Sequence, residues 1–104
     1  MITLVKTPTK VAEKRDLKDT NEIYNVVSSN DYPDFITFDE KYRIGMYIDD
    51  SGRLMMNGKN FVFNGHIIYG TVVFVGLDKE GSPVSLKRVQ IEIIKYYLDK
   101  KSLR

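Results

Sequence analysis

The segment TVVFVG, residues 71–76, decides how this chain of 104 residues folds. Its apolar and β-branched residues form a continuous run, which is typical of a strand that is buried on both faces of a sheet. Glycines stand directly before and at the end of the run, at Gly70 and Gly76. We therefore predict that residues 71–75 form the central strand of the fold.

Shorter strands are predicted on both sides of this segment. Residues 2–5 are an apolar run, and residues 11–17 alternate with one charged face, which is typical of an edge strand. Glycine-containing turns at 49–52, 57–58 and 64–65 separate the strands expected in the middle of the chain. Those strands are expected at residues 35–38, 42–48, 53–56, 61–63 and 67–69.

Two helices are predicted, at residues 19–30 and 85–101. Asp19 lies three residues before Glu22, which is the spacing of a capping box, and an apolar stripe follows at positions 23, 26 and 27. In the second helix Ser85 is the expected N-cap, and apolar residues recur at 86, 89, 93 and 97, with 90, 94 and 98 beside them. The chain therefore reads as one α+β domain, residues 1–104, in which both helices cover a mainly antiparallel sheet of about five to six strands.

The composition excludes several classes of function. With no cysteine and one histidine, the chain has no disulfide framework, no thiol nucleophile and no site built from several histidines. Its net charge is +2, yet residues 1–52 hold seven basic and ten acidic side chains, whereas residues 53–104 hold nine and four. A basic second half favours nucleic acid or an acidic protein face as a partner, although an ordinary solvated surface with a basic helix gives the same count.

No pattern of residues indicates catalysis. His66 follows a predicted turn, where a surface histidine is expected rather than a general base. The carboxylates at 39–40 and at 49–50 are neighbours in sequence, and on a strand such neighbours point to opposite faces. The glycines of segment 65–76 match no phosphate-binding fingerprint. We therefore expect no catalytic residue, no cofactor and no metal ion.

Aromatic side chains are the candidates for binding, because they make up 12% of the chain. Aromatic rings beside basic groups are typical of proteins that bind single-stranded nucleic acid, and aromatic residues also anchor protein interfaces and fill cores. These three roles stay open for the aromatic residues of this sequence. The binding residues that we nominate are Tyr47, Arg53, Asn57, Phe61 and Phe63.

The segments YIDDSGRL (47–54), Asn57, IYGTVVFVG (68–76) and VSL (84–86) resemble a family of small domains of unknown function. Phages, plasmids and other mobile elements of bacteria encode this family. Its members share an acidic-glycine turn followed by leucine, a downstream asparagine, an Ile-x-Gly-Thr strand and a Ser-Leu start of a helix. Residues 57–67 depart from the pattern with an added or altered hairpin. The family supplies no activity that can be carried over to this chain. The resemblance implies a small accessory protein of a mobile element; proteins of that kind often bind a host protein, and counter-defence is a common role among them.

These observations lead to one functional hypothesis and two alternatives. We expect a non-enzymatic accessory protein of a phage or mobile element that binds and inhibits or modulates a host protein, such as a defence effector of the CRISPR type. The alternatives are a protein that binds nucleic acid through its basic second half and a protein that binds a nucleotide or signal molecule. No apolar run approaches the ~20 residues of a membrane span, and no signal peptide is evident. The expected location is the bacterial cytoplasm.

Overall fold

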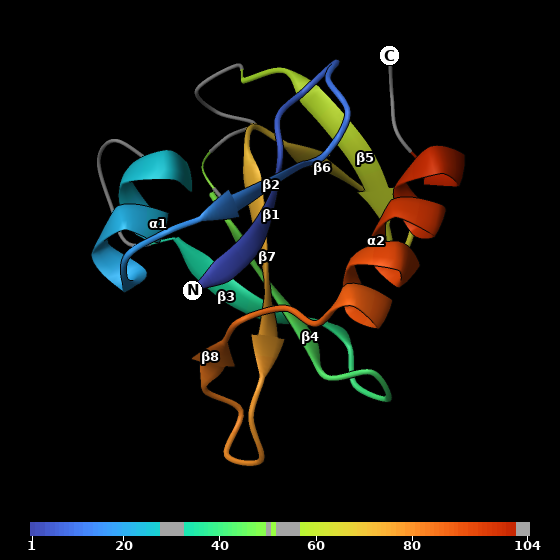
Figure 1. Ribbon diagram of the computed structural model, residues 1–104. Coiled ribbons are helices and arrows are strands. Elements are labelled where there is room, and N and C mark those ends of the chain that lie inside the picture. Colours follow the sequence, from blue (N-terminus) through green and yellow to red (C-terminus); the bar gives the residue numbers. More distant parts are fainter. Residues whose placement is uncertain (28–32, 50, 52–56, 102–104) are drawn as a thin grey trace.

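The fold is built around the apolar segment 71–75, most of which forms a central strand. The computed structural model (Figure 1) describes residues 1–27, 33–49, 51 and 57–101. Along the chain its elements are β1 (Ile2–Lys6), β2 (Glu13–Asp16), α1 (Thr20–Val27), β3 (Asp34–Asp39), β4 (Ile44–Ile48), β5 (Lys59–Phe63), β6 (His66–Tyr69), β7 (Val72–Leu77), β8 (Pro83–Val84) and α2 (Arg88–Lys101). This arrangement confirms the predicted α+β class.

The main sheet has the strand order β2-β1-β7-β4-β3, and all neighbouring strands are antiparallel. The sixth strand of this sheet, β8, pairs with β7 and stands outside this order of five. β7 therefore lies in the middle of the sheet, and its residues from Val72 to Gly76 are buried, as the apolar run predicts. β2 is an end strand with four exposed, charged residues. Charges on an end strand discourage pairing with other chains, so the predicted edge strand is confirmed.

β5 and β6 form a separate two-stranded sheet. Asn64 and Gly65 join them with φ angles of 51° and 77°, the left-handed conformation that a tight hairpin turn of this type requires. The sequence predicts this hairpin but not its separation from the main sheet. The buried side chain of Asn60 connects the hairpin to its surroundings, because its Nδ2 donates hydrogen bonds to the carbonyl oxygens of Lys6 (2.8 Å) and Gly70 (2.7 Å).

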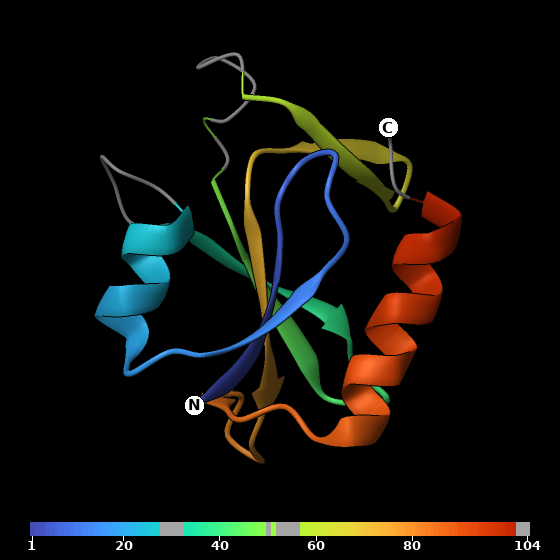
Figure 2. The same cartoon turned by 45° about the horizontal axis from the view of Figure 1, so that its top comes forward.

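The two helices cover opposite faces of the main sheet (Figure 2). Alternate residues of β7 point to the two sides. Val73 and Val75 belong to the core beneath α1, whereas Val72 and Phe74 belong to the core beneath α2. The central strand thus contributes side chains to both cores.

The start of α1 matches its prediction. The Oδ1 atom of Asp19 accepts a hydrogen bond from the backbone N–H of Glu22 (3.0 Å), and Ile23 and Val27 are buried. The Glu22 carboxylate accepts the N–H of Lys18 (2.9 Å), one residue before the cap. Of the predicted helix 19–30, residues 28–30 lie outside the described residues.

The start of α2 differs from its prediction. The helix begins at Arg88 rather than at residue 85. Ser85 is not its N-cap, because its Oγ accepts a hydrogen bond from the N–H of Ile2 (2.8 Å) and so fixes the start of β1. The buried residues of α2 are Gln90, Ile94 and Leu98, whereas Val89, expected on the apolar stripe, is 54% exposed.

The strands predicted in the middle of the chain agree only in part with the structure. The strand predicted at 42–48 begins at Ile44, because residues 41–43 form a turn in which Arg43 has a φ of 55°. The returning strand at 53–56 and most of the turn at 49–52 lie outside the described residues. Among the described residues, no helix is long and apolar enough to cross a membrane.

Candidate binding site

Two of the nominated binding residues lie inside the protein. Tyr47 is 4% exposed and packs between Phe35 and Tyr24, with ring centroids 4.4 and 5.9 Å away. Burial, with a smaller contribution from Tyr24, raises the pKa of the Tyr47 hydroxyl. Phe61 is fully buried in the core beneath α2. Neither ring reaches the surface, so the prediction that they anchor a partner is wrong, and both are core residues.

The other nominated residues do not form a common site either. Phe63 is half-buried, and its ring stacks on Phe38 with centroids 5.4 Å apart. Asn57 is exposed, and Arg53 lies outside the described residues. Most aromatic side chains in the core beneath α2 therefore contribute to packing. The Tyr97 hydroxyl in addition donates a hydrogen bond to the carbonyl oxygen of Val62 (2.8 Å).

A different surface has the features of a binding site, namely a groove between the β1–β2 hairpin and α2. Two cavities of about 250 and about 370 Å³ lie along it, and Lys95 lines both. Hairpin residues form one wall and helix residues form the other, consistent with the positions of these elements in Figure 2. We call this surface the hairpin–helix groove. The side chains and backbone that line it belong to Ile2, Lys6, Thr9, Lys10, Val11, Ala12, Lys14, Leu86, Arg88, Ile91, Glu92, Lys95, Leu98 and Asp99.

Positive charge dominates the hairpin–helix groove. Its lining contains five basic residues and two carboxylates, Glu92 and Asp99. One carboxylate is engaged locally, because Glu92 Oε1 lies 3.5 Å from Arg88 Nε. Lys10, Lys14 and Lys95 form no ion pair with any described residue. These unpaired ammonium groups favour a ligand that carries negative charge.

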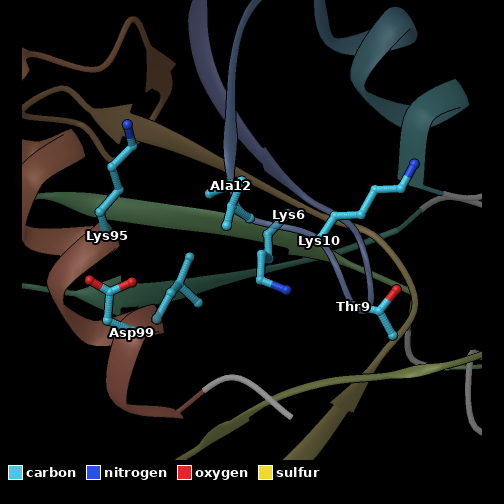
Figure 3. A pocket seen from close by; sticks show the side chains of 8 residues that line it. Lys6, Thr9, Lys10, Ala12, Lys95 and Asp99 are labelled. Carbon is cyan, nitrogen blue, oxygen red and sulfur yellow. The ribbon is translucent and has the colours of Figure 1, made fainter. Parts of the chain in front are cut away.

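Lys6 places a cation at the base of the groove. The residue is only 3% exposed, and its Nζ donates a hydrogen bond to the carbonyl oxygen of Thr7 (2.9 Å). In Figure 3 this ammonium turns toward the hairpin loop, on the side of Thr9, while Lys10 and Lys95 extend outward on opposite sides. A charge that is shielded from water acts more strongly on a neighbouring group than an exposed one. Lys6 therefore contributes to the field inside the groove, and the other two contribute at its rim.

The rest of the lining is mainly apolar. Ile2, Leu86 and Ile91 line one cavity, and Val11, Ala12 and Leu98 line the other. Val11 is 77% exposed, the highest exposure among the large apolar residues of the described part. No aromatic residue lines either cavity. Apolar walls with a cationic rim suit a ligand that combines acidic and apolar groups.

Sequence reasoning misses this groove because its charges come from distant parts of the chain. Lys10 and Lys14 belong to the half of the sequence with an acidic balance, whereas Arg88 and Lys95 belong to the basic half. Counting charge by halves separates residues that the antiparallel pairing of β1 and β2 and the packing of α2 bring together. No local motif marks the two hairpin lysines.

The remaining surface shows no metal-binding group among the described residues, where no three histidine or carboxylate side chains gather. His66 is exposed at the first position of β6. Comparison of the chain with protein-family models, with curated proteins and with solved structures finds no match.

Proposed function

We propose that this protein is a non-enzymatic binding protein whose hairpin–helix groove holds an acidic, partly apolar segment of a partner protein. The observation that carries this proposal is the excess of cations around apolar walls, with three lysines that have no ion pair in the described part. Charge complementarity would guide the partner to the groove. Burial of its apolar side chains against the exposed Val11 and the partly buried Ile91 would then hold it.

The composition of the groove favours a protein segment over nucleic acid. Proteins that bind single strands stack bases on aromatic side chains along a cationic track, and no aromatic residue lines these cavities. Glu92 and Asp99 interrupt the row of cations on α2. Such carboxylates would repel a continuous phosphate backbone, whereas a protein segment can place its acidic and apolar residues between them.

The nature of the partner is inferred from the family resemblance of residues 47–86. Small accessory proteins of phages and other mobile elements commonly act on proteins of the bacterial host. This resemblance supports a host protein as the partner, and a defence effector of the CRISPR type is the example that we favour. The protein would inhibit or modulate the effector by occupying one of its acidic surfaces.

The first experiment measures the chemistry of the groove with defined probes. A labelled peptide in which glutamate alternates with leucine should bind the full chain saturably, as measured by fluorescence polarisation, and the same peptide with lysine in place of glutamate should not. Lys95→Glu should weaken binding by about tenfold, equivalent to ~1.4 kcal/mol, because Lys95 lines both cavities. Lys59→Glu is the matched control, because Lys59 is exposed on β5 and lines neither cavity.

The second experiment concerns the biological partner. Tagged protein is incubated with a host lysate, and captured proteins are compared between Lys95→Glu and Lys59→Glu. The proposal requires a partner that the first variant loses and the second retains. Equal capture by both variants would contradict it. Tight binding of a single-stranded oligonucleotide would also contradict the proposal, if Lys95→Glu abolishes that binding and the affinity falls steeply between about 50 and about 200 mM salt. Nucleic acid would then be the ligand of the groove.

A further inference from the structure

A third cavity, of about 490 Å³, lies beside the first turn of α2 and shares no lining residue with the hairpin–helix groove. Three chain segments line it: the β3–β4 turn at 41–43, the β7–β8 turn from residue 77, and residues 84–90. Its volume lies within the ~300–1,000 Å³ that is typical of sites for small molecules. We call it the turn cavity.

Four basic residues from these three segments line the turn cavity, namely Lys41, Arg43, Lys79 and Lys87. None of them forms an ion pair with a described residue. The only carboxylate in the lining is Asp78, and its Oδ1 already accepts hydrogen bonds from the N–H groups of Glu80 (2.9 Å) and Ser82 (2.8 Å). The cavity therefore offers four unpaired positive charges to a ligand.

Apolar surface gathers at the same place. Tyr42, Val84 and Val89 line the turn cavity and are 41%, 39% and 54% exposed. They are three of the seven large apolar residues that are exposed in the described part. The Nζ of Lys41 lies 5.3 Å from the centroid of the Tyr42 ring. A ligand that satisfies the whole cavity must combine negative charge with a flat or apolar portion.

The three segments are fixed in place by a single buried side chain and by short backbone contacts. Gln90 is 7% exposed, its Nε2 donates to the carbonyl oxygens of Tyr42 (2.8 Å) and Arg43 (3.0 Å), and its Oε1 accepts the N–H of Lys87 (2.7 Å). The N–H of Leu77 donates to the same Arg43 carbonyl (2.9 Å). A site whose backbone segments are already held in place by the fold loses less conformational entropy when it binds a ligand.

Arg43 supplies an independent observation. Its φ of 55° lies in the left-handed region, where a side chain is strained and glycine is not. The residue is exposed, so packing does not require its long side chain. An arginine at a backbone position suited to glycine, in the lining of a cationic cavity, is explained if the guanidinium contacts a ligand. Arginine is well suited to bidentate hydrogen bonds with phosphate oxygens.

We propose that the turn cavity binds a nucleotide that carries at least two phosphates. The four cations hold the phosphate oxygens, and the exposed ring of Tyr42 packs against the base. Aromatic side chains can stack on every base. We therefore expect the cavity to discriminate between ligands by their number of phosphates more than by their base. The proposal does not depend on the hairpin–helix groove, because none of the four cations lines that groove.

The test is calorimetric titration of the full chain with ADP, AMP, adenosine and pyrophosphate. ADP should bind saturably, AMP about tenfold more weakly, and adenosine not measurably, because each lost phosphate removes charge-assisted hydrogen bonds. Pyrophosphate should bind more weakly than ADP, since it lacks a base. Tyr42→Ala should therefore weaken the binding of ADP and leave the binding of pyrophosphate unchanged.

Arg43→Gly separates ligand binding from folding. Glycine adopts this φ without strain, so the thermal midpoint should stay the same or rise while the affinity for ADP falls by about tenfold. Lys59→Ala, which removes an exposed cation outside the cavity, should leave the affinity unchanged. Binding of the glutamate–leucine peptide should not respond to Arg43→Gly.

Three results would overturn the proposal. One is the absence of saturable ADP binding up to about 1 mM. Another is an equal loss of affinity in Arg43→Gly and Lys59→Ala, which would indicate nonspecific charge attraction. The third is binding of a single-stranded oligonucleotide that free ADP does not displace, because the cavity would then be part of a nucleic-acid surface.

Discussion

Asn60 is a polar side chain enclosed in the interior, and it holds the β5–β6 hairpin against the main sheet. Its Nδ2 donates two hydrogen bonds, to Lys6 and to Gly70, whereas its Oδ1 is buried without a partner among the described residues. Asn60→Ala should lower the free energy of unfolding by about 2 kcal/mol, because two buried carbonyl groups lose their donor. Urea denaturation measures this change. Asn57→Ala, an exposed asparagine on the same arm, should alter stability by less than about 0.5 kcal/mol.

Tyr47 makes stability depend on alkaline pH. Burial, with help from Tyr24, raises the pKa of its hydroxyl in the folded protein above the value of ~10 expected when the chain is unfolded. Below that value both states keep the proton and the full stability is present. As the pH rises through the folded pKa the unfolded state releases the proton more readily, so stability is lost.

Tyr47→Phe should therefore flatten the fall in stability above about pH 10, as followed by thermal denaturation across that range. Some dependence should remain, because burial also raises the pKa of Tyr97. Tyr96→Phe is the control, since Tyr96 is 66% exposed. An equal effect of Tyr96→Phe would show that the loss does not come from the buried hydroxyl.

At the scale of the elements, the start of α2 invites a direct comparison of two residues. Ser85 accepts the N–H of Ile2, whereas Gln90 accepts the N–H of Lys87 just before the helix. Ser85→Ala should speed amide exchange at Ile2 and leave Lys87 unchanged, and Gln90→Ala should do the reverse. Nuclear magnetic resonance measures both amides in one sample. Faster amide exchange at Lys87 in Ser85→Ala would contradict this assignment, because it would show that Ser85 caps the helix.

The same elements show how far sequence patterns reach. The run 72–75, the Asn64–Gly65 turn and the Asp19 cap are local signals, and the structure confirms each of them. Ser85 has the residue type of a cap, but the backbone of β1 competes for its hydroxyl from 83 positions away in the sequence. Which sheet a hairpin joins, and which side of α2 is buried, likewise depend on distant partners that no local pattern contains.

For the whole molecule, the difference between local signals and contacts with distant residues explains why the hairpin–helix groove could not be predicted from the sequence. Tyr47 and Phe61 are aromatic, and composition alone does not say whether a ring faces a core or a partner. The topology places them on opposite faces of the sheet, each in its own core. The cations of the hairpin–helix groove meet only after Lys14 on β2 and Lys95 on α2 have been brought together by the fold. Neither fact follows from spacing in the sequence.

The two cores should nevertheless unfold together, because both depend on β7. Phe74 packs beneath α2 and its neighbour Val73 packs beneath α1, so the strand cannot leave one core while it stays in the other. Phe74→Ala should lower the free energy of unfolding by about 3–5 kcal/mol, which is a large part of the stability of a small domain. Hydrogen exchange followed by mass spectrometry in increasing urea can report on residues 20–27 and 88–101 separately. We expect both helices to lose protection at one common midpoint, and that midpoint to fall equally for both in Phe74→Ala. Protection of α1 that persists after α2 has lost its own would show that the faces of the sheet unfold independently, and that β7 does not couple them.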